Sequence, residues 1–312
     1  MDCKNPMLAV FDDSTGKYRF IGAVNHLKTY NNDSLLHDST GKVKYLPCGQ
    51  CLACRINRSK DWAARCVLES RMHDQNSFIT LTYNPENLPK DLSLHKDDFQ
   101  KFMKRLRKFL DKRGIKISYY MCGEYGELYQ RPHYHVCIFG WYPDDYKLWR
   151  IRDGVKLYIS PTLQKLWPFG FITVGDVTYE SAAYVARYVV KKYTGEMGEE
   201  FYGDRLPPYT NMSLKPAIGQ RFFEKFSEEI YQRESVIIKG NMKAKIPRYY
   251  DNIYDRYYGE GAFDLLVKQK RELSSDCRFK KLPVEYTLRR VVDRAKVCEV
   301  KAERLRRDYV EE

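Results

Sequence analysis

The sequence predicts an α+β fold, in which helices flank a central antiparallel β-sheet and a basic helical region follows toward the C-terminal end. Two observations support this prediction. The middle of the chain reads in the order strand, helix, two strands, strand and helix, and strands that follow one another directly favour antiparallel pairing. The chain has 312 residues, enough for about two domains of ordinary size and a sizeable core.

The N-terminal part is expected to form short strands and one helix. Residues 7–47 read as short strands, with a turn over the Asp-Asp-Ser-Thr-Gly run at 12–16. Residues 52–72 read as a helix, because their apolar side chains fall on one shared side. We expect this Cys-containing segment, residues 1–74, to pack on the core of the protein.

The core is predicted to cover residues 75–200. The run FITLTY at 78–83 is rich in β-branched and aromatic residues and stops at an Asn-Pro pair, as a strand does. Residues 97–113 carry large apolar side chains at helical spacing before Gly114, which predicts an amphipathic helix. The remaining predicted elements of the core are strands at 115–123, 132–140 and about 170–175, and a helix over 177–194.

The chain changes character beyond Gly195. Residues 203–208 read as a loop, and the segments after them are charged and helical. From about residue 284 to the end we expect a basic helix. Residues 201–312 are therefore a separate C-terminal region, and the sequence assigns no function to it.

The charge balance favours a polyanionic partner. There are 54 Lys and Arg residues against 41 Asp and Glu, a net charge of +13, and each cation near a phosphate releases condensed counterions. The 26 Tyr residues either stack on unpaired bases or fill half-exposed sheet positions. No apolar stretch is long enough to span a membrane and no secretory signal stands at the start, so we expect no membrane partner.

One face of the predicted helix 97–113 carries cations only. These are candidates for contact with DNA phosphates, with a merely solvated helix face as the alternative. The residues are Lys101, Lys104, Arg105, Lys108 and Lys112.

Two histidines form the triplet His133-Tyr134-His135 on a predicted strand. Residues two apart on a strand point to the same face, so both imidazoles can bind one divalent ion and leave positions open for water and a phosphate oxygen. If the preceding hairpin turns near residue 128, Glu124 is the third ligand, and Glu127 is the alternative. The competing interpretation is that both histidines only form hydrogen bonds with their neighbours.

The predicted helix 177–194 presents two tyrosines on one side. At about 100° per residue, Tyr184, Arg187, Tyr188 and Lys191 share a face. A phenol is a weak nucleophile at neutral pH, but a metal on a phosphate and a nearby cation would favour the phenolate. Attack on a phosphodiester would leave a phosphotyrosine and a free 3′-OH. The alternative is that the tyrosines only stack on a neighbour or on bases.

Three segments resemble, in order, the motifs of rolling-circle replication initiators of the HUH endonuclease family. They are FITLTY at 78–83, RPHYHV at 131–136 and YVARYVVKK at 184–192. The runs PCGQCLACR at 47–55 and MSLKPAIG at 212–219 also resemble segments of the initiators of gokushovirus-type microviruses, which are phages with circular single-stranded DNA.

This resemblance implies an HUH-endonuclease-like sheet with a catalytic core at 75–200. It implies that His133 and His135 bind the catalytic Mg²⁺ or Mn²⁺, with Glu124 as a less secure third ligand, and that Tyr184 and Tyr188 are the nucleophiles. Arg187 and Lys191 would stabilise charge during catalysis. Two further cations inside the motifs are expected to contact DNA: Arg131 and Lys192.

The resemblance also implies an activity and its partners. The protein would nick single-stranded DNA at a replication origin, hold the 5′ end covalently and rejoin strands during rolling-circle replication. Host DNA polymerase and a helicase would be its partners, and the host cell cytoplasm its location.

A cysteine cluster precedes the first predicted helix. Cys48, Cys51 and Cys54, with Cys66 twelve residues later, have the spacing of a structural Zn²⁺ site, although Cys66 is expected on an apolar helix side. The alternative is four free cysteines. A non-catalytic, zinc-stabilised nucleic-acid-binding protein would use the same charge and cysteines, but it leaves the paired His and paired Tyr unexplained. A two-histidine phosphoesterase would need a second His motif, and the chain has none.

Overall fold

The computed structural model describes Cys3 and residues 5–15, 17–23, 43–126, 128–152, 154–191 and 196–276. The chain divides into two compact units. One comprises Met1–Arg58 with Leu273–Glu312, and the other comprises Ser59–Glu272.

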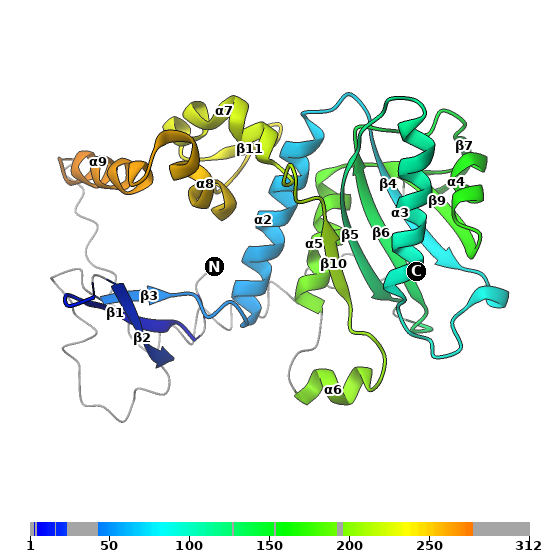
Figure 1. Ribbon diagram of the computed structural model, residues 1–312, viewed down its shortest axis with the longest axis horizontal. Coiled ribbons are helices and arrows are strands. Elements are labelled where there is room, and N and C mark those ends of the chain that lie inside the picture. Colours follow the sequence, from blue (N-terminus) through cyan, green and yellow to red (C-terminus); the bar gives the residue numbers. More distant parts are fainter. Residues whose placement is uncertain are drawn as a thin grey trace. The chain divides into compact units, whose positions relative to one another are not determined.

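The smaller unit contains a three-stranded antiparallel sheet in the order β2–β1–β3 (Figure 1). Its strands are β1 (Met7–Asp12), β2 (Lys17–Ala23) and β3 (Val43–Leu46). The predicted turn joins β1 to β2: the Asp12 carboxylate accepts hydrogen bonds from the amide and the hydroxyl of Ser14, which stabilises a tight reversal. Helix α2 (Leu52–Ser70) begins in this unit and ends in the larger one.

The larger unit is built on a seven-stranded sheet in the order β10–β5–β6–β4–β9–β8–β7, and every neighbouring pair is antiparallel. Its strands are β4 (Asn76–Tyr83), β5 (Ser118–Tyr125), β6 (Pro132–Phe139), β7 (Lys147–Arg152), β8 (Val155–Ile159), β9 (Gly170–Asp176) and β10 (Tyr209–Met212).

Helices and one small hairpin complete the described chain. A 3₁₀ turn, η2, covers Pro85–Asn87. The hairpin consists of β11 (Val236–Lys239) and β12 (Met242–Ala244). The helices are α3 (Lys96–Asp111), α4 (Pro161–Leu166), α5 (Tyr179–Lys191), α6 (Glu196–Tyr202), α7 (Gln220–Arg233), α8 (Arg248–Tyr258) and α9 (Ala262–Asp276).

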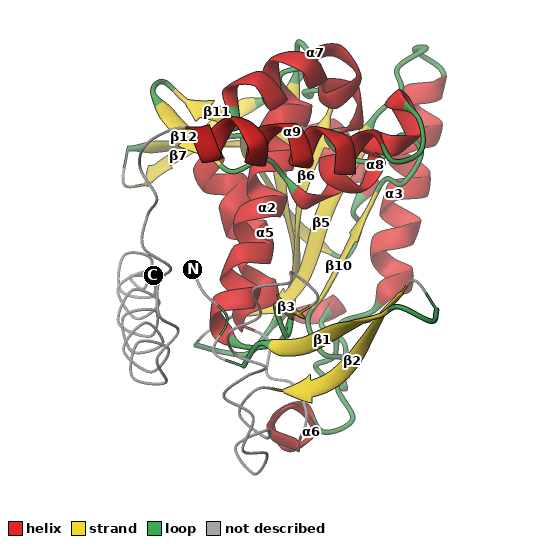
Figure 2. Ribbon diagram, turned by 90° about the vertical axis from the view of Figure 1, so that its left-hand side faces the viewer, coloured by secondary structure: helices red, strands yellow, loops and turns green. Residues whose placement is uncertain are grey.

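Helices cover both faces of the large sheet (Figures 1 and 2). On one face, α3 and α4 bury Phe102, Leu106 and Leu163 against Leu81 and Val136. On the other face, α5 and the second half of α2 bury their small and apolar side chains against the strands, together with α7 and α8. Because side chains alternate along a strand, β4, β5 and β6 contribute to both layers.

The predicted α+β fold is confirmed. The expected helices 97–113 and 177–194 are α3 and α5, and the expected strands 115–123 and 132–140 are β5 and β6. The hairpin β7–β8 and the edge strand β10 were not predicted, because such short strands with mixed polar residues show too little alternation. The basic helix expected from about residue 284 lies outside the described residues. The division at 74 and 200 stays a prediction.

Candidate metal centre and active site

Three side chains converge on one face of adjacent strands. The β5–β6 register places Glu124 opposite His133 and Cys122 opposite His135, so that Glu124 and both imidazoles share a face. Their ligand atoms lie within 4.8 Å of one another. Glu124 is the carboxylate that the structure brings to the histidine pair, while the alternative third ligand, Glu127, lies outside the described residues.

A single carboxylate oxygen lies at the centre of this group. Oε1 of Glu124 lies 2.8 Å from Nε2 of His133 and 2.7 Å from Nε2 of His135. The two imidazole rings are perpendicular, with centroids 4.9 Å apart. Glu124 and His135 are buried and His133 is half-buried, so the group is largely shielded from bulk water.

The outer nitrogen of each imidazole also has a partner. Nδ1 of His133 lies 3.1 Å from the backbone oxygen of Arg131. A carbonyl can only accept, so this nitrogen carries a proton, and the neutral ring then presents the lone pair of Nε2 to Glu124. Nδ1 of His135 lies 2.9 Å from Oγ1 of Thr80 on β4. Such contacts to the outer nitrogen orient metal-binding histidines.

The residues present fit a divalent cation. A lone pair facing a carboxylate is repulsive unless a proton or a cation lies between them. Oε2 of Glu124 is buried and accepts no hydrogen bond within the part of the chain that the structure describes, and a buried carboxylate oxygen normally has a partner. Burial acts to raise the pKa of the Glu124 carboxyl, but His135 and His133 beside it lower that pKa to about 2. The site thus offers a permanent negative charge and two imidazoles, which suits a divalent cation.

Helix α5 brings Tyr184 to the same centre. The Tyr184 hydroxyl donates a hydrogen bond to Oε1 of Glu124 over 3.1 Å, and its ring packs edge-on against His135 at 5.0 Å. Phe78 of β4 also stacks on His135, with centroids 5.6 Å apart and planes 9° from parallel. The predicted nucleophile therefore contacts the predicted metal ligands directly.

The other predicted residues of α5 follow the helix. Its buried side is confirmed, since Ala182, Val185 and Ala186 are fully buried. Arg187 is half-buried three residues beyond Tyr184. Tyr188 and Lys191 belong to the helix, but their side chains lie outside the described part of the chain, as does all of Lys192.

The cations of α3 lie in a different layer from the metal centre. Helix α3 covers the opposite face of the sheet from α5 (Figure 2). Lys101, Lys104 and Lys108 are exposed there. Arg105 is half-buried and its Nε donates to the backbone oxygen of Leu166, the last residue of α4, over 2.8 Å. Arg105 thus satisfies a helix end, and the role of these residues in DNA binding stays a prediction.

Arg131 shapes the hairpin beside the metal centre. Its guanidinium donates to the backbone oxygen of Tyr83 over 2.9 Å, and its own backbone oxygen accepts from Gly126 at 3.0 Å and faces His133. Its predicted DNA contact also stays a prediction. Sequence reasoning did not single out Phe78 and Thr80, although alternation along 78–83 puts both on one strand face and could have indicated them.

The structure separates the predicted zinc ligands. Cys48, Cys51 and Cys54 come together, with Cys3 as their fourth neighbour. Cys66 is fully buried within α2, about 18 Å along the helix from Cys54. The sequence prediction missed Cys3, because 45 residues separate it from Cys48 and it belongs to no spaced motif.

No helix in the described part of the chain is long and apolar enough to cross a membrane.

Known proteins resemble this chain over most of its length. The family model of the replication-associated protein ORF2 matches residues 76–193. The chain is 37% identical over 246 residues to the replication-associated protein VP4 of Bdellovibrio phage phiMH2K, which covers 75% of this chain and 76% of that protein. It is 34% identical over 255 residues to the replication-associated protein ORF2 of Spiroplasma virus 4, covering 78% and 76%. It is 31% identical over 246 residues to the replication-associated protein ORF4 of Chlamydia phage 1, covering 76% and 60%. No solved structure is significantly similar to this chain.

Proposed function

Because the chain belongs to the family of replication-associated proteins of microviruses, we propose that it initiates replication by nicking single-stranded DNA with a tyrosine. The observation that supports this chemistry is the contact of the Tyr184 hydroxyl with Glu124, at 3.1 Å, beside His133 and His135. A phenol and a three-ligand metal centre at hydrogen-bond distance are the components that phosphodiester transfer needs.

Glu124, His133 and His135 would hold Mg²⁺ or Mn²⁺. When bound, the cation would neutralise charge on the phosphate that is cut. The Tyr184 hydroxyl already donates toward Oε1 of Glu124, so its proton has an acceptor as the phenolate forms. Arg187, on the same helix, and Lys191 are proposed to stabilise the developing negative charge.

The reaction exchanges one phosphate ester for another. The phenolate oxygen attacks phosphorus, the bond from phosphorus to the 3′ oxygen breaks, and that oxygen leaves with a proton as a free 3′-OH. The 5′ phosphate stays on the tyrosine. Because a phenolate is a good leaving group, a later 3′-OH can reverse the step and rejoin the strand. Tyr188, one helical turn away, is proposed as the second nucleophile.

The partners follow from this role. We propose that the free 3′-OH primes a host DNA polymerase while a helicase opens the duplex, in the host cytoplasm. Lys101, Lys104, Arg105, Lys108, Arg131 and Lys192 are proposed to contact the DNA backbone.

A denaturing gel tests the proposal. Purified protein is incubated with labelled single-stranded DNA that covers its own replicon, with Mg²⁺, Mn²⁺ or EDTA. We expect a metal-dependent shifted band that survives SDS and is absent from the Tyr184→Phe/Tyr188→Phe variant. Salt-sensitive binding without an adduct, for every fragment and both metals, would instead indicate a non-catalytic, zinc-stabilised nucleic-acid-binding protein.

A further inference from the structure

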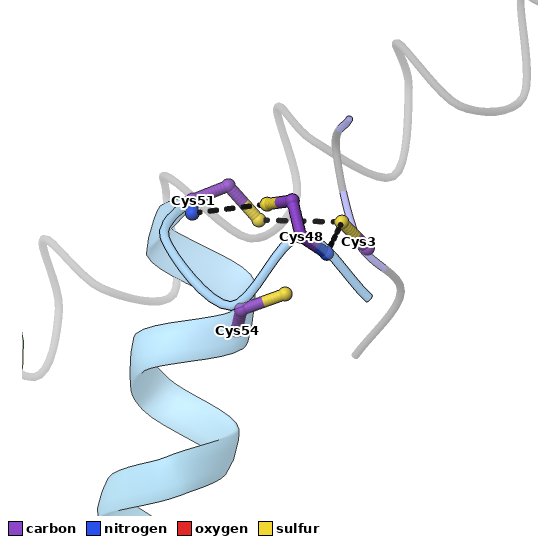
Figure 3. A group of neighbouring side chains, drawn as sticks. All are labelled: Cys3, Cys48, Cys51 and Cys54. Carbon is purple, nitrogen blue, oxygen red and sulfur yellow. Dashed lines mark hydrogen bonds between the residues drawn. The ribbon is translucent and has the colours of Figure 1, made fainter. Parts of the chain in front are cut away.

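We propose that Cys3, Cys48, Cys51 and Cys54 form a tetrahedral zinc site that ties the N-terminal end of the chain to the start of α2. The four residues come from separate places: Cys3 precedes β1, Cys48 follows β3, and the other two lie at the first turn of α2. Their sulfur atoms point toward one shared space (Figure 3). The site is independent of the Glu124 centre and of the nicking activity proposed above.

The separations of the sulfur atoms match one bound ion. All four lie within 4.8 Å of one another. Zinc–sulfur bonds of about 2.3 Å in a tetrahedron separate the sulfurs by about 3.8 Å. The Sγ atoms of Cys3 and Cys51 lie 3.8 Å apart, which is the length of such an edge. All four cysteines are free thiols, so no disulfide accounts for their proximity.

Backbone amides are directed at the sulfur atoms. The amide of Cys51 donates to Sγ of Cys48 over 3.3 Å, and the amide of Cys48 donates to Sγ of Cys3 over 3.2 Å. Gly49 has a φ of +76°, a left-handed conformation that lets the chain reverse between the two cysteines. Amide contacts of this kind orient thiolate ligands and offset part of their negative charge.

The ligand set favours zinc. Thiolates select soft or borderline ions, and four of them around a single ion give the tetrahedral geometry of structural zinc sites. Two residues separate Cys48 from Cys51 and Cys51 from Cys54, which is a spacing found in such sites. Each thiol would lose its proton as the ion binds.

The smaller unit has a physical need for such a site. In the part of it that the structure describes, the buried apolar side chains beside Cys54 are Leu8, Ala9, Ala53 and Ile56. A core of this size supplies little stability, and small units commonly depend on a bound metal instead. The site would also close the 45-residue loop between Cys3 and Cys48, which restricts the unfolded chain.

The zinc content of the full-length protein, purified with a reductant and without chelator, tests this inference. We expect about one thiolate-bound zinc ion per chain and its loss in Cys3→Ser. Cys66→Ala is the matched control, because it removes a buried thiol outside the cluster, and it should retain the zinc. Cys3→His should also retain it, since imidazole can replace a thiolate, and this shows that loss in Cys3→Ser is not a failure to fold.

Cobalt substitution gives a second readout. Co²⁺ added to the zinc-free protein should produce thiolate-to-metal charge transfer in the wild type and in Cys66→Ala, and a weaker band in Cys3→Ser. Full zinc and full band intensity in Cys3→Ser would overturn the inference, and so would loss of both in Cys66→Ala, bound iron instead of zinc, or a disulfide among the four cysteines. Because the readout is metal held by thiols, it stays interpretable even if no DNA adduct forms.

Discussion

The hydroxyl of Tyr184 lies 3.1 Å from Oε1 of Glu124, although 60 residues separate the two in the sequence. The same oxygen lies within hydrogen-bond distance of Nε2 of both His133 and His135. One carboxylate oxygen therefore connects the proposed nucleophile to both proposed metal-binding imidazoles, and changes at any of these residues should have separable effects.

Removing the Tyr184 hydroxyl should stop the first covalent step without weakening DNA binding. We expect Tyr184→Phe to slow adduct formation by at least about 10³-fold, the scale on which loss of a nucleophile acts. Affinity should stay nearly unchanged, because the ring remains. The measurement is single-turnover adduct formation with saturating DNA, and Tyr179→Phe, half-buried on the same helix, is the matched control.

The second tyrosine decides how this result is interpreted. If Tyr184→Phe forms adduct at the wild-type rate, Tyr188 makes the first cut, and peptide mapping of the adduct would show it. Adduct formation at that rate by the Tyr184→Phe/Tyr188→Phe protein would contradict the mechanism.

Glu124→Gln should weaken metal binding while preserving side-chain size. It removes the negative charge and one ligand of the centre, so we expect Mn²⁺ affinity to fall by at least about 100-fold. The measurement is titration of Mn²⁺ followed by electron paramagnetic resonance. Glu180→Gln, an exposed change on α5, should leave affinity unchanged. Equal affinity in Glu124→Gln and wild type would remove Glu124 from the ligand set.

Glu124 should also make the metal-free protein sensitive to acid. Its pKa is about 2, below the ordinary value of about 4.3, so the unfolded state takes up the proton first as pH falls. The carboxylate then contributes about 3 kcal/mol above pH 5, and this contribution is lost between pH 5 and 2. Urea unfolding in EDTA at several pH values should show a shallower acid slope for Glu124→Gln. Parallel slopes would refute this.

The exposed lysines of α3 should affect affinity and leave chemistry unchanged. Lys104→Ala/Lys108→Ala should lower the slope of log affinity against log salt by about 1.4, since each phosphate contact on a single strand contributes about 0.7. Because α3 covers the face opposite α5, the adduct rate at saturating DNA should not change. Lys225→Ala/Lys243→Ala, which removes two exposed cations elsewhere, is the control. An unchanged slope would show that α3 does not contact DNA.

Gly170 should be essential for the pairing of β9 with β4. A β-carbon there would collide with the backbone of Thr82, Tyr83 and Asn84, and backbone cannot move aside cheaply. We expect Gly170→Ala to lower the free energy of unfolding by at least about 2 kcal/mol. Gly175→Ala on the same strand, where a β-carbon meets nothing within 4 Å, should change it little. Thermal unfolding compares the two, and equal melting temperatures would disprove the clash.

Patterns of short range were sufficient to predict most of the core. Helix α3 follows from apolar side chains at helical spacing, β4 from β-branched residues, and the shared face of His133 and His135 from the period of two along a strand. The hairpin turn brought Glu124 into consideration because strand pairing extends from a known turn. Each of these features depends on residues close in the sequence, so local physical chemistry determines them.

Tertiary structure decided which of these features meet. The contact between Tyr184 and Glu124 requires α5 to pack on one particular face of the sheet, and the same choice leaves the lysines of α3 on the other face. Cys3 joins the thiol cluster in place of Cys66 only because β1 and β3 pair and carry both ends of a long loop together. Periodicity shows that an element has a buried side, but the packing partner of that side depends on residues far away in the chain, and for this reason no local pattern could predict these contacts.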